Sequence, residues 1–133
     1  MTDDDVMLGG GCLCGAVRFT AAGQPLWVAH CHCADCRRAT AAALATYAGF
    51  PREKVRFPAG EPAGYQSSPG VTRRFCPDCG TQIYSTSVEE EDRILGLRVG
   101  TARQWAALVP RKQIWHRSSL DWVGNLDDIE RVE

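Results

Sequence analysis

Three cysteines and two histidines occupy the segment HCHCADC, residues 30–36, of a chain of 133 residues. The four other cysteines stand in two close pairs, within CLC and CPDC. We call these groups the N-terminal pair (Cys12 and Cys14), the cysteine cluster (Cys31, Cys33 and Cys36) and the knuckle pair (Cys76 and Cys79). Cysteines one or two residues apart can point at one metal ion from a single turn, and thiolate sulfur is a common zinc ligand. The spacing therefore predicts metal binding.

A disulfide framework explains these cysteines less well than metal binding does. Their number is odd, and Cys-x-Cys neighbours bridge each other only with strain. The first residues, MTDDD, are acidic where an export signal would be basic. We therefore expect a cytoplasmic protein, whose thiols stay reduced.

Seven thiols divide into four, which close a tetrahedral zinc site, and three, which leave one coordination position open for substrate or water. Cys33 and Cys36 with the knuckle pair would make a zinc-ribbon pattern. Alternatively, the N-terminal pair joins the knuckle pair and leaves the cysteine cluster intact. We prefer the second division, because one six-residue segment can preorganise three ligands. The structural ion would then close a loop of more than sixty residues, which constrains the chain most.

His30 and His32 alternate with two cysteines of the cluster. If a strand ends at Cys31, both imidazoles lie on the face opposite the thiols, so we expect them to support neighbouring groups. A histidine ligand would close the open site and remove the catalytic interpretation.

Arg37 and Arg38 directly follow the cluster. Their charges could offset the thiolates or face solvent. Alternatively, one guanidinium could clamp a substrate carboxylate through a bidentate contact, which makes both residues candidate substrate-binding groups.

The segments around the cysteines are rich in strand-forming residues, so we expect a mainly β fold of eight to ten short strands. Strands are predicted within residues 16–22, 25–31, 43–50, 51–57, 72–75, 81–87, 93–102 and 112–118. A loop is expected at residues 58–68 and one short helix at 102–108, ending before Pro110. The knuckle pair should lie at a hairpin tip, with Gly80 at positive φ.

The length and composition of the chain restrict the number of domains and the kinds of partner it can bind. The length and a hydrophobic fraction of 44% suit one domain over residues 1–133, with residues 1–8 and 124–133 loosely attached. The formal charge of -1 and the lack of a basic stripe argue against nucleic-acid binding. No apolar run is long enough to span a membrane.

Five motifs together carry a resemblance to a known family: GGCLCGAVRF, HCHCADCRRAT, AGFPREKVRF, YQSSPGVTRRFCPDCGTQIY and PRKQIWHRSSLDW. They resemble the glutathione-dependent formaldehyde-activating enzymes, also described as S-(hydroxymethyl)glutathione synthase-like proteins, whose fold is similar to the Mss4-like β-tent. The resemblance extends from about Gly10 to Trp122 and includes all seven cysteines.

The resemblance implies two zinc ions, a structural one and a catalytic one, in a β-tent of short antiparallel strands. The structural ion would be held by Cys12, Cys14, Cys76 and Cys79, and the catalytic one by Cys31, Cys33 and Cys36. It also implies a carbon-sulfur lyase acting on a thiol adduct, with glutathione and formaldehyde as the expected components. The open zinc would bind the thiol sulfur, lower its pKa and hold it beside a carbonyl carbon.

The chain departs from the family pattern at two positions. Ala41 stands where many relatives carry glycine, and Gln113 where many carry histidine. Either change could alter substrate preference without altering metal binding. A non-catalytic, zinc-stabilised binding or scaffold module is the alternative function, and it requires that a further side chain close the site at the cysteine cluster.

Overall fold

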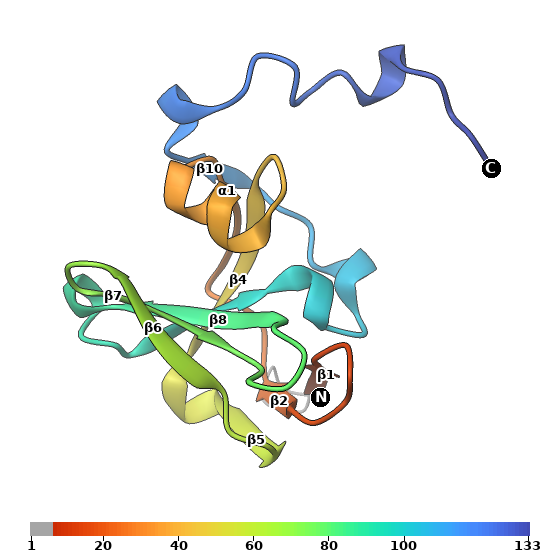
Figure 1. Cartoon of the computed structure of the whole chain (residues 1–133). Coiled ribbons are helices and arrows are strands. Elements are labelled where there is room, and N and C mark those ends of the chain that lie inside the picture. Colours follow the sequence, from red (N-terminus) through yellow and green to blue (C-terminus); the bar gives the residue numbers. More distant parts are fainter. Residues whose placement is uncertain (1–6) are drawn as a thin grey trace.

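The computed structural model describes residues 7–133, in which ten strands form two sheets (Figure 1). The strands are β1 (Met7–Gly11), β2 (Arg18–Ala22), β3 (Trp27–Cys31), β4 (Ala45–Pro51), β5 (Val55–Ala59), β6 (Ala63–Ser68), β7 (Val71–Phe75), β8 (Gln82–Ser87), β9 (Ile94–Arg98) and β10 (Lys112–Ile114). One α-helix, α1 (Ala34–Thr40), connects β3 to β4. The expected mainly β architecture of short strands is confirmed.

The smaller sheet has the strand order β1-β2-β5, and the larger has the order β10-β3-β4-β9-β8-β7-β6. The larger sheet is antiparallel except for its edge pair, in which β10 runs parallel to β3. This order places β7 and β9 on either side of β8, and β9 beside β4. Residues 47, 73 and 98, far apart in the chain, therefore come from three strands of one sheet, within the consecutive order β4-β9-β8-β7.

The main hydrophobic core joins the two sheets. Its buried side chains come from both sheets and include Leu8, Phe19, Val55, Ile83, Leu95 and Leu97. Leu8 and Phe19 alternate with more exposed residues along β1 and β2, as expected for strands with one face turned toward the core.

Strand β4 is buried on both faces and separates two packed regions. Ala48 and Phe50 belong to the main core, whereas Ala45 and Tyr47 pack with Cys31 and Cys36 in a second cluster. Since successive side chains of a strand point to opposite faces, one strand supplies both the main core and the wall behind the cysteine cluster.

Two secondary-structure predictions are wrong. Residues 102–108 form no α-helix; the only helical part is a 3-10 turn at Trp105–Ala107. Seven residues are too few to form a stable helix alone, and contacts with β1 fix this segment, since the Arg103 N–H donates to the Gly9 carbonyl at 2.8 Å. Residues 58–68 are not all loop, because Ala63–Ser68 form β6 and pair with β7.

Strands β7 and β8 form the predicted hairpin, with the knuckle pair at its tip. Gly80 has φ of 80°, as expected for a turn that needs a left-handed residue. The predicted strand at residues 112–118 is shorter than expected. Trp115, with φ of 55°, ends it and leads into a 3-10 turn, His116–Ser118.

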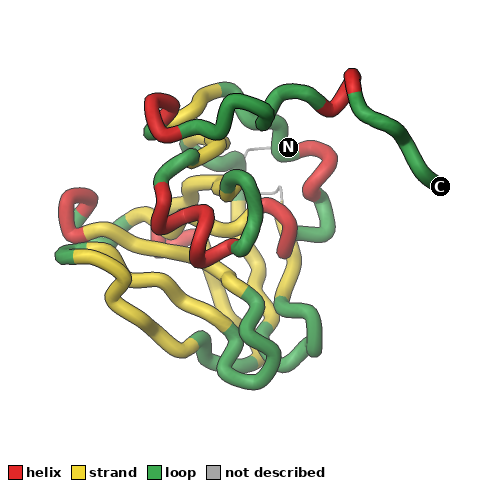
Figure 2. The backbone as a smooth tube through the Cα atoms, turned by 45° about the horizontal axis from the view of Figure 1, so that its top comes forward, coloured by secondary structure: helices red, strands yellow, loops and turns green. Residues whose placement is uncertain are grey.

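The chain ends differ in how they join the sheets. Met7 and Leu8 pair with β2, although residues 1–8 were expected to be loosely attached; residues 1–6 lie outside the described part. At the other end, residues 124–133 leave the sheets as an extended tail with one helical turn (Figure 2). Within residues 7–133, no helix is long and apolar enough to cross a membrane.

Candidate functional site

The N-terminal pair lies in a tight turn between β1 and β2. The Cys12 N–H donates to the Val17 carbonyl at 3.0 Å, and the Val17 N–H donates back to the Cys12 Sγ at 3.2 Å. Gly15 has φ of 88° and allows the chain to reverse. The turn brings the Sγ atoms of Cys12 and Cys14 to 3.6 Å from each other.

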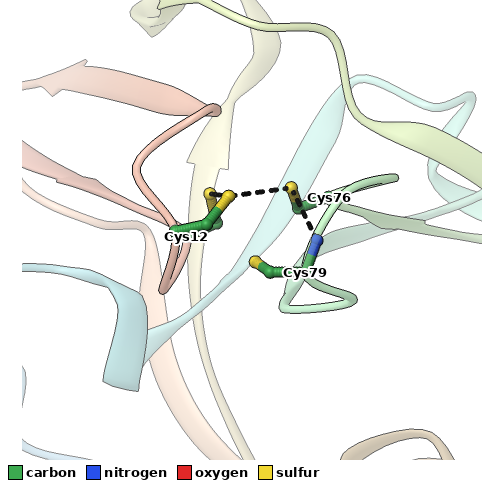
Figure 3. Close-up of side chains that lie close together, drawn as sticks. Cys12, Cys76 and Cys79 are labelled. Atoms are coloured by element: carbon green, nitrogen blue, oxygen red, sulfur yellow. Dashed lines mark hydrogen bonds between the residues drawn. The ribbon is translucent and has the colours of Figure 1, made fainter.

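The knuckle pair faces this turn from the β7–β8 hairpin. The N–H groups of Asp78 and Cys79 both donate to the Cys76 Sγ at 3.4 Å. The two loops are tied together by the Leu13 N–H, which donates to the Thr81 Oγ1 at 3.1 Å. Cysteine side chains from the two loops point toward one another (Figure 3).

The four sulfur atoms fit a tetrahedral metal ion. All lie within 4.8 Å of one another, and none belongs to a disulfide. Ligands about 2.3 Å from zinc in a tetrahedron would lie roughly 3.8 Å apart. The distance of 3.8 Å between the Sγ atoms of Cys14 and Cys76 matches this value. The Val17 N–H that donates to the Cys12 Sγ also favours the thiolate form that a metal needs.

The cysteine cluster forms where β3 ends and α1 begins. Cys31 is the last residue of β3, and Cys33 is the N-cap of α1, where its Sγ accepts the Cys36 N–H at 3.2 Å. Cys36 is 4% exposed and points inward from the first turn of α1. The three sulfur atoms lie within 4.8 Å of one another. Among the described residues, no fourth Cys, His, Asp or Glu donor joins them. The cluster therefore offers a metal ion three ligands.

Polar groups from β4 and β7 contact the cluster from behind. The Tyr47 hydroxyl lies 3.1 Å from the Cys36 Sγ. Arg73 donates from Nη1 to the Tyr47 hydroxyl at 3.2 Å, and its Nη1 and Nη2 atoms lie 3.9 and 3.8 Å from the Cys36 Sγ. The guanidinium of Arg98 lies 4.1 Å from the centre of the Tyr47 ring. Two positive charges thus lie near the thiols.

These contacts shift the pKa values of the cluster in opposite directions. Hydrogen bonding with Cys31, supported by Cys33, Tyr47 and the charge of Arg73, lowers the pKa of Cys36 to about 5, although burial opposes the shift. The hydrogen bond to Cys36 and burial raise the pKa of Cys31. Burial raises the pKa of Tyr47 to about 12, so this phenol stays protonated. Cys36 is thus the sulfur most readily present as thiolate.

Neither histidine belongs to a cysteine group. The His30 Nδ1 lies 2.8 Å from the Thr46 Oγ1, across the β3–β4 pair. His32 is 1% exposed, and its Nε2 lies 2.8 Å from the Oε1 of Gln113 on β10. Both imidazoles therefore contact neighbouring strands. Gln113, one of the two departures from the family pattern, serves here as the hydrogen-bond partner of a buried histidine.

The structure does not bring the two candidate substrate-binding arginines into the space beside the cluster. The Nη1 of Arg37 donates to the carbonyls of His32 and Ser118, so this side chain ties α1 to the turn at His116–Ser118. Arg38 lines a separate hollow together with Tyr65. Arg37 has a clear structural role in this arrangement.

A cavity of about 660 Å³ adjoins the cysteine cluster. Cys31, Cys33 and Cys36 contribute to its lining, and so do Tyr47, Arg73 and Trp27. The other charged side chains on its wall are those of Asp35, Glu89, Glu90 and Lys112. The Lys112 Nζ lies 5.2 Å from the centre of a Trp27 ring. The cavity thus combines three possible metal ligands with cationic and anionic side chains.

Sequence reasoning did not identify Tyr47, Arg73 and Arg98 as part of this site. Their strands are distant in the chain and meet only in the order β4-β9-β8-β7. A signal did exist for the arginines, because each falls on a buried position of a strand, where charge is rare without a partner.

The comparisons with known proteins concern the family and the fold of the chain. The profile of the family described as "Glutathione-dependent formaldehyde-activating enzyme" matches residues 7–118, a range that contains all seven cysteines. A crystal structure of a Rhodobacter sphaeroides protein has a similar fold, with a TM-score of 0.63 and 22% identity over 79% of this chain and 98% of that chain. A comparison with curated proteins found no significant match. Since the family profile covers most of its length, the chain belongs to the glutathione-dependent formaldehyde-activating enzyme family.

Proposed function

We propose that this protein is a zinc-dependent carbon-sulfur lyase that makes or breaks the adduct of a thiol with formaldehyde or a related carbonyl compound. Glutathione is the proposed thiol. One observation carries the proposal: three cysteine sulfurs, one fewer than a closed tetrahedral site needs, line a cavity of about 660 Å³. Family membership supports the same substrate class.

Zinc suits both cysteine groups, because all the ligands are sulfur and the groups contain four and three of them. We propose that Cys12, Cys14, Cys76 and Cys79 hold a structural ion. The ion at Cys31, Cys33 and Cys36 would supply a Lewis acid that lowers the pKa of a substrate thiol. The two ions per chain would thus have different tasks.

The protein's own groups would orient the electrophile. A guanidinium has five N–H donors, and the contacts of Arg73 described above leave some of them free for a carbonyl oxygen. In adduct formation the substrate sulfur bonds to the carbonyl carbon, and the π electron pair moves to the oxygen. That oxygen takes a proton from water and becomes a hydroxyl group. The reverse sequence releases thiol and formaldehyde.

The charges on the cavity wall support glutathione as the thiol. This tripeptide carries two carboxylates and one ammonium group besides its sulfur. Lys112 offers a cation for a carboxylate, and Glu89 and Glu90 offer anions for the ammonium group. The volume of the cavity lies within the range typical of small-molecule sites.

We further propose that residues 1–133 act as one domain in the cytoplasm. Seven free cysteines at metal-ligand spacing favour a reducing compartment. A formal charge of -1 favours a small-molecule substrate over nucleic acid.

Exchange spectroscopy by NMR tests this function. Zinc-loaded protein is added to formaldehyde and glutathione, and the exchange rate between free glutathione and the hydroxymethyl adduct is measured. We expect the protein to raise this rate and Cys33→Ser to abolish the increase. Exchange rates that are equal with and without protein would refute the formaldehyde reaction.

Two cationic neighbours provide a matched comparison for recognition of glutathione. Lys112→Gln removes a charge from the cavity wall, whereas Arg111→Gln removes one from a residue that does not line this cavity. We expect only Lys112→Gln to raise the KM for glutathione, by about tenfold. Equal effects of both substitutions would contradict this assignment.

A further inference from the structure

In the part of the chain that the structure describes, two buried arginines lie behind the cysteine cluster without a carboxylate partner; we call Arg73 and Arg98 the arginine pair. Each is only 6% exposed. The hydrogen bonds of Arg73 go to neutral hydroxyls, the Ser67 Oγ at 2.8 Å and the Tyr47 hydroxyl at 3.2 Å, and its remaining contacts go to the Cys36 Sγ. Within residues 7–133, none of the three side-chain nitrogens of Arg98 has a hydrogen-bond partner.

Burying an unpaired cation is costly, so such groups in native proteins normally face an opposite charge. Tyr47 lies between the two arginines, but it offers them a hydroxyl group and an aromatic ring rather than a carboxylate. The Cys36 Sγ lies 3.8 Å from the Arg73 Nη2, and Arg98 stacks on the ring of Tyr47, whose hydroxyl contacts the same sulfur. The cysteine cluster is therefore the natural counter-charge of the arginine pair.

The charge balance at the cluster differs from that at the four-cysteine group. Three thiolates with one divalent ion carry a single negative charge, whereas the arginine pair carries two positive charges. Asp35, Glu89 and Glu90 also line the cavity, but none of the ion pairs found in the described part of the chain joins them to the arginine pair. One positive charge next to the cluster therefore lacks a direct counter-charge, and a fourth ligand with one negative charge would neutralise it. In the four-cysteine group, the hydrogen bonds to sulfur come instead from backbone N–H groups and the Thr81 hydroxyl.

We propose that the arginine pair makes the fourth position at the cysteine cluster selective for a monoanionic ligand, the substrate thiolate, over neutral ligands. This inference rests on the proposed function and assigns the ligand selectivity of the fourth metal position to two residues. Arg73 lines the cavity and acts directly on the ligand. Arg98 does not line it and acts from behind the Tyr47 ring as a positioning residue.

Cobalt(II) in place of zinc gives a direct optical test, because a new sulfur ligand changes the sulfur-to-metal charge-transfer spectrum. The dissociation constants of glutathione, an anionic ligand as thiolate, and of imidazole, a neutral ligand, are measured by titration. The unmodified protein is compared with Arg73→Gln, Arg73→Lys and Arg98→Met. Arg111→Gln is the control for loss of a positive charge outside this cavity.

We expect Arg73→Gln and Arg98→Met to weaken glutathione binding by at least about tenfold and to change imidazole binding by less than about twofold. Arg73→Lys keeps the charge and should bind glutathione within about threefold of the unmodified protein. Arg98→Met should fold, since apolar replacement of a buried, unpaired charge is often neutral or stabilising. Thermal melting checks the fold of each variant before titration.

Two results would overturn the inference. In the first, both ligands weaken by the same factor in the variants, which indicates general damage to the site. In the second, glutathione binds the variants as tightly as it binds the unmodified protein. Because no formaldehyde is present, loss of selectivity is measured separately from turnover. A protein that binds glutathione selectively but fails the exchange assay would refute only the proposed lyase reaction.

Discussion

Cys33 has two roles in the structure, and serine would keep only one of them. Its Sγ caps α1 by accepting the Cys36 N–H, and it also belongs to the three-sulfur cluster. Serine is among the best N-cap residues but is a poor zinc ligand. We therefore expect Cys33→Ser to fold with an unchanged circular dichroism spectrum and to lose the ion of the cluster, so that zinc per chain falls from about two to about one.

Metal analysis by mass spectrometry checks this prediction. Cys76→Ser is the comparison, since it removes a fully buried ligand of the four-cysteine group and should impair folding. Zinc content that stays near two ions per chain in Cys33→Ser would contradict the role of Cys33 as a ligand.

Ala41 ends α1 in a conformation that suits glycine. Its φ of 55° and ψ of 42° are left-handed, and its N–H donates to the Arg37 carbonyl as the C-cap. A side chain in this conformation costs about 1 kcal/mol or more, a cost that glycine avoids. We expect Ala41→Gly to stabilise the protein by about 1 kcal/mol and raise Tm by a few degrees.

Ala39→Gly is the matched control for this prediction. It makes the same chemical change inside α1, where glycine should destabilise the helix by about 1 kcal/mol. Differential scanning calorimetry measures both. If Ala41→Gly lowered Tm, the left-handed cap could not be a source of strain.

At the scale of elements, Arg37 joins α1 to the segment that follows β10. Arg37 donates to two carbonyls, and each hydrogen bond from a charged donor can contribute about 1.5–3 kcal/mol to the free energy of unfolding. When the side chain is removed, water binds the freed carbonyls and recovers part of this free energy. We expect Arg37→Ala to lower the free energy of unfolding by about 1–3 kcal/mol, and Arg38→Ala to change it by less than about 0.5 kcal/mol. Urea denaturation measures both variants.

The same two variants address the alternative role of these arginines as clamps for a substrate carboxylate. In the structure neither lines the cavity at the cysteine cluster. An Arg37→Ala variant with unchanged stability and a strongly raised KM for glutathione would restore the clamp and contradict the structural role.

Some elements could be predicted from sequence because their signals are local. The knuckle hairpin follows from two strand-like segments around CPDC and a glycine suited to positive φ. Helix α1 could not be predicted, because its N-cap is a cysteine, which is not among the usual capping residues. Strand β6 was missed because its surroundings are rich in glycine and proline, and its pairing with β7 depends on the backbone.

In the candidate site, too, the residues with a local sequence pattern could be predicted, and those brought together by the fold could not. Spacing alone left two divisions of the seven cysteines open, whereas the sulfur positions bring the N-terminal pair and the knuckle pair together and leave the cysteine cluster as the second group. The arrangement of Tyr47, Arg73 and Arg98 depends on the order of strands in the larger sheet, which no local pattern specifies. Sequence reasoning therefore identified the possible ligands but not the groups that surround them.

At the scale of the whole molecule, the four-cysteine group connects the turn after β1 with the β7–β8 hairpin. A metal ion there would link two segments that are more than sixty residues apart in the chain. Since structural metal binding contributes directly to folding free energy, we expect removal of zinc by a strong chelator to lower Tm by more than about 10 °C. Thermal melts of chelated and zinc-restored protein measure this change. Equal melting temperatures would show that no structural ion is present.

We propose that the cysteine cluster holds a metal ion with one coordination position open to the sulfur of the substrate. A crystal structure of zinc-loaded protein with bound glutathione is the decisive experiment. We expect a metal bound by Cys31, Cys33 and Cys36, with the glutathione sulfur about 2.3 Å from the ion as its fourth ligand. A fourth position filled by His30, His32 or another side chain, with glutathione absent from the cavity, would show that this position is not a substrate site.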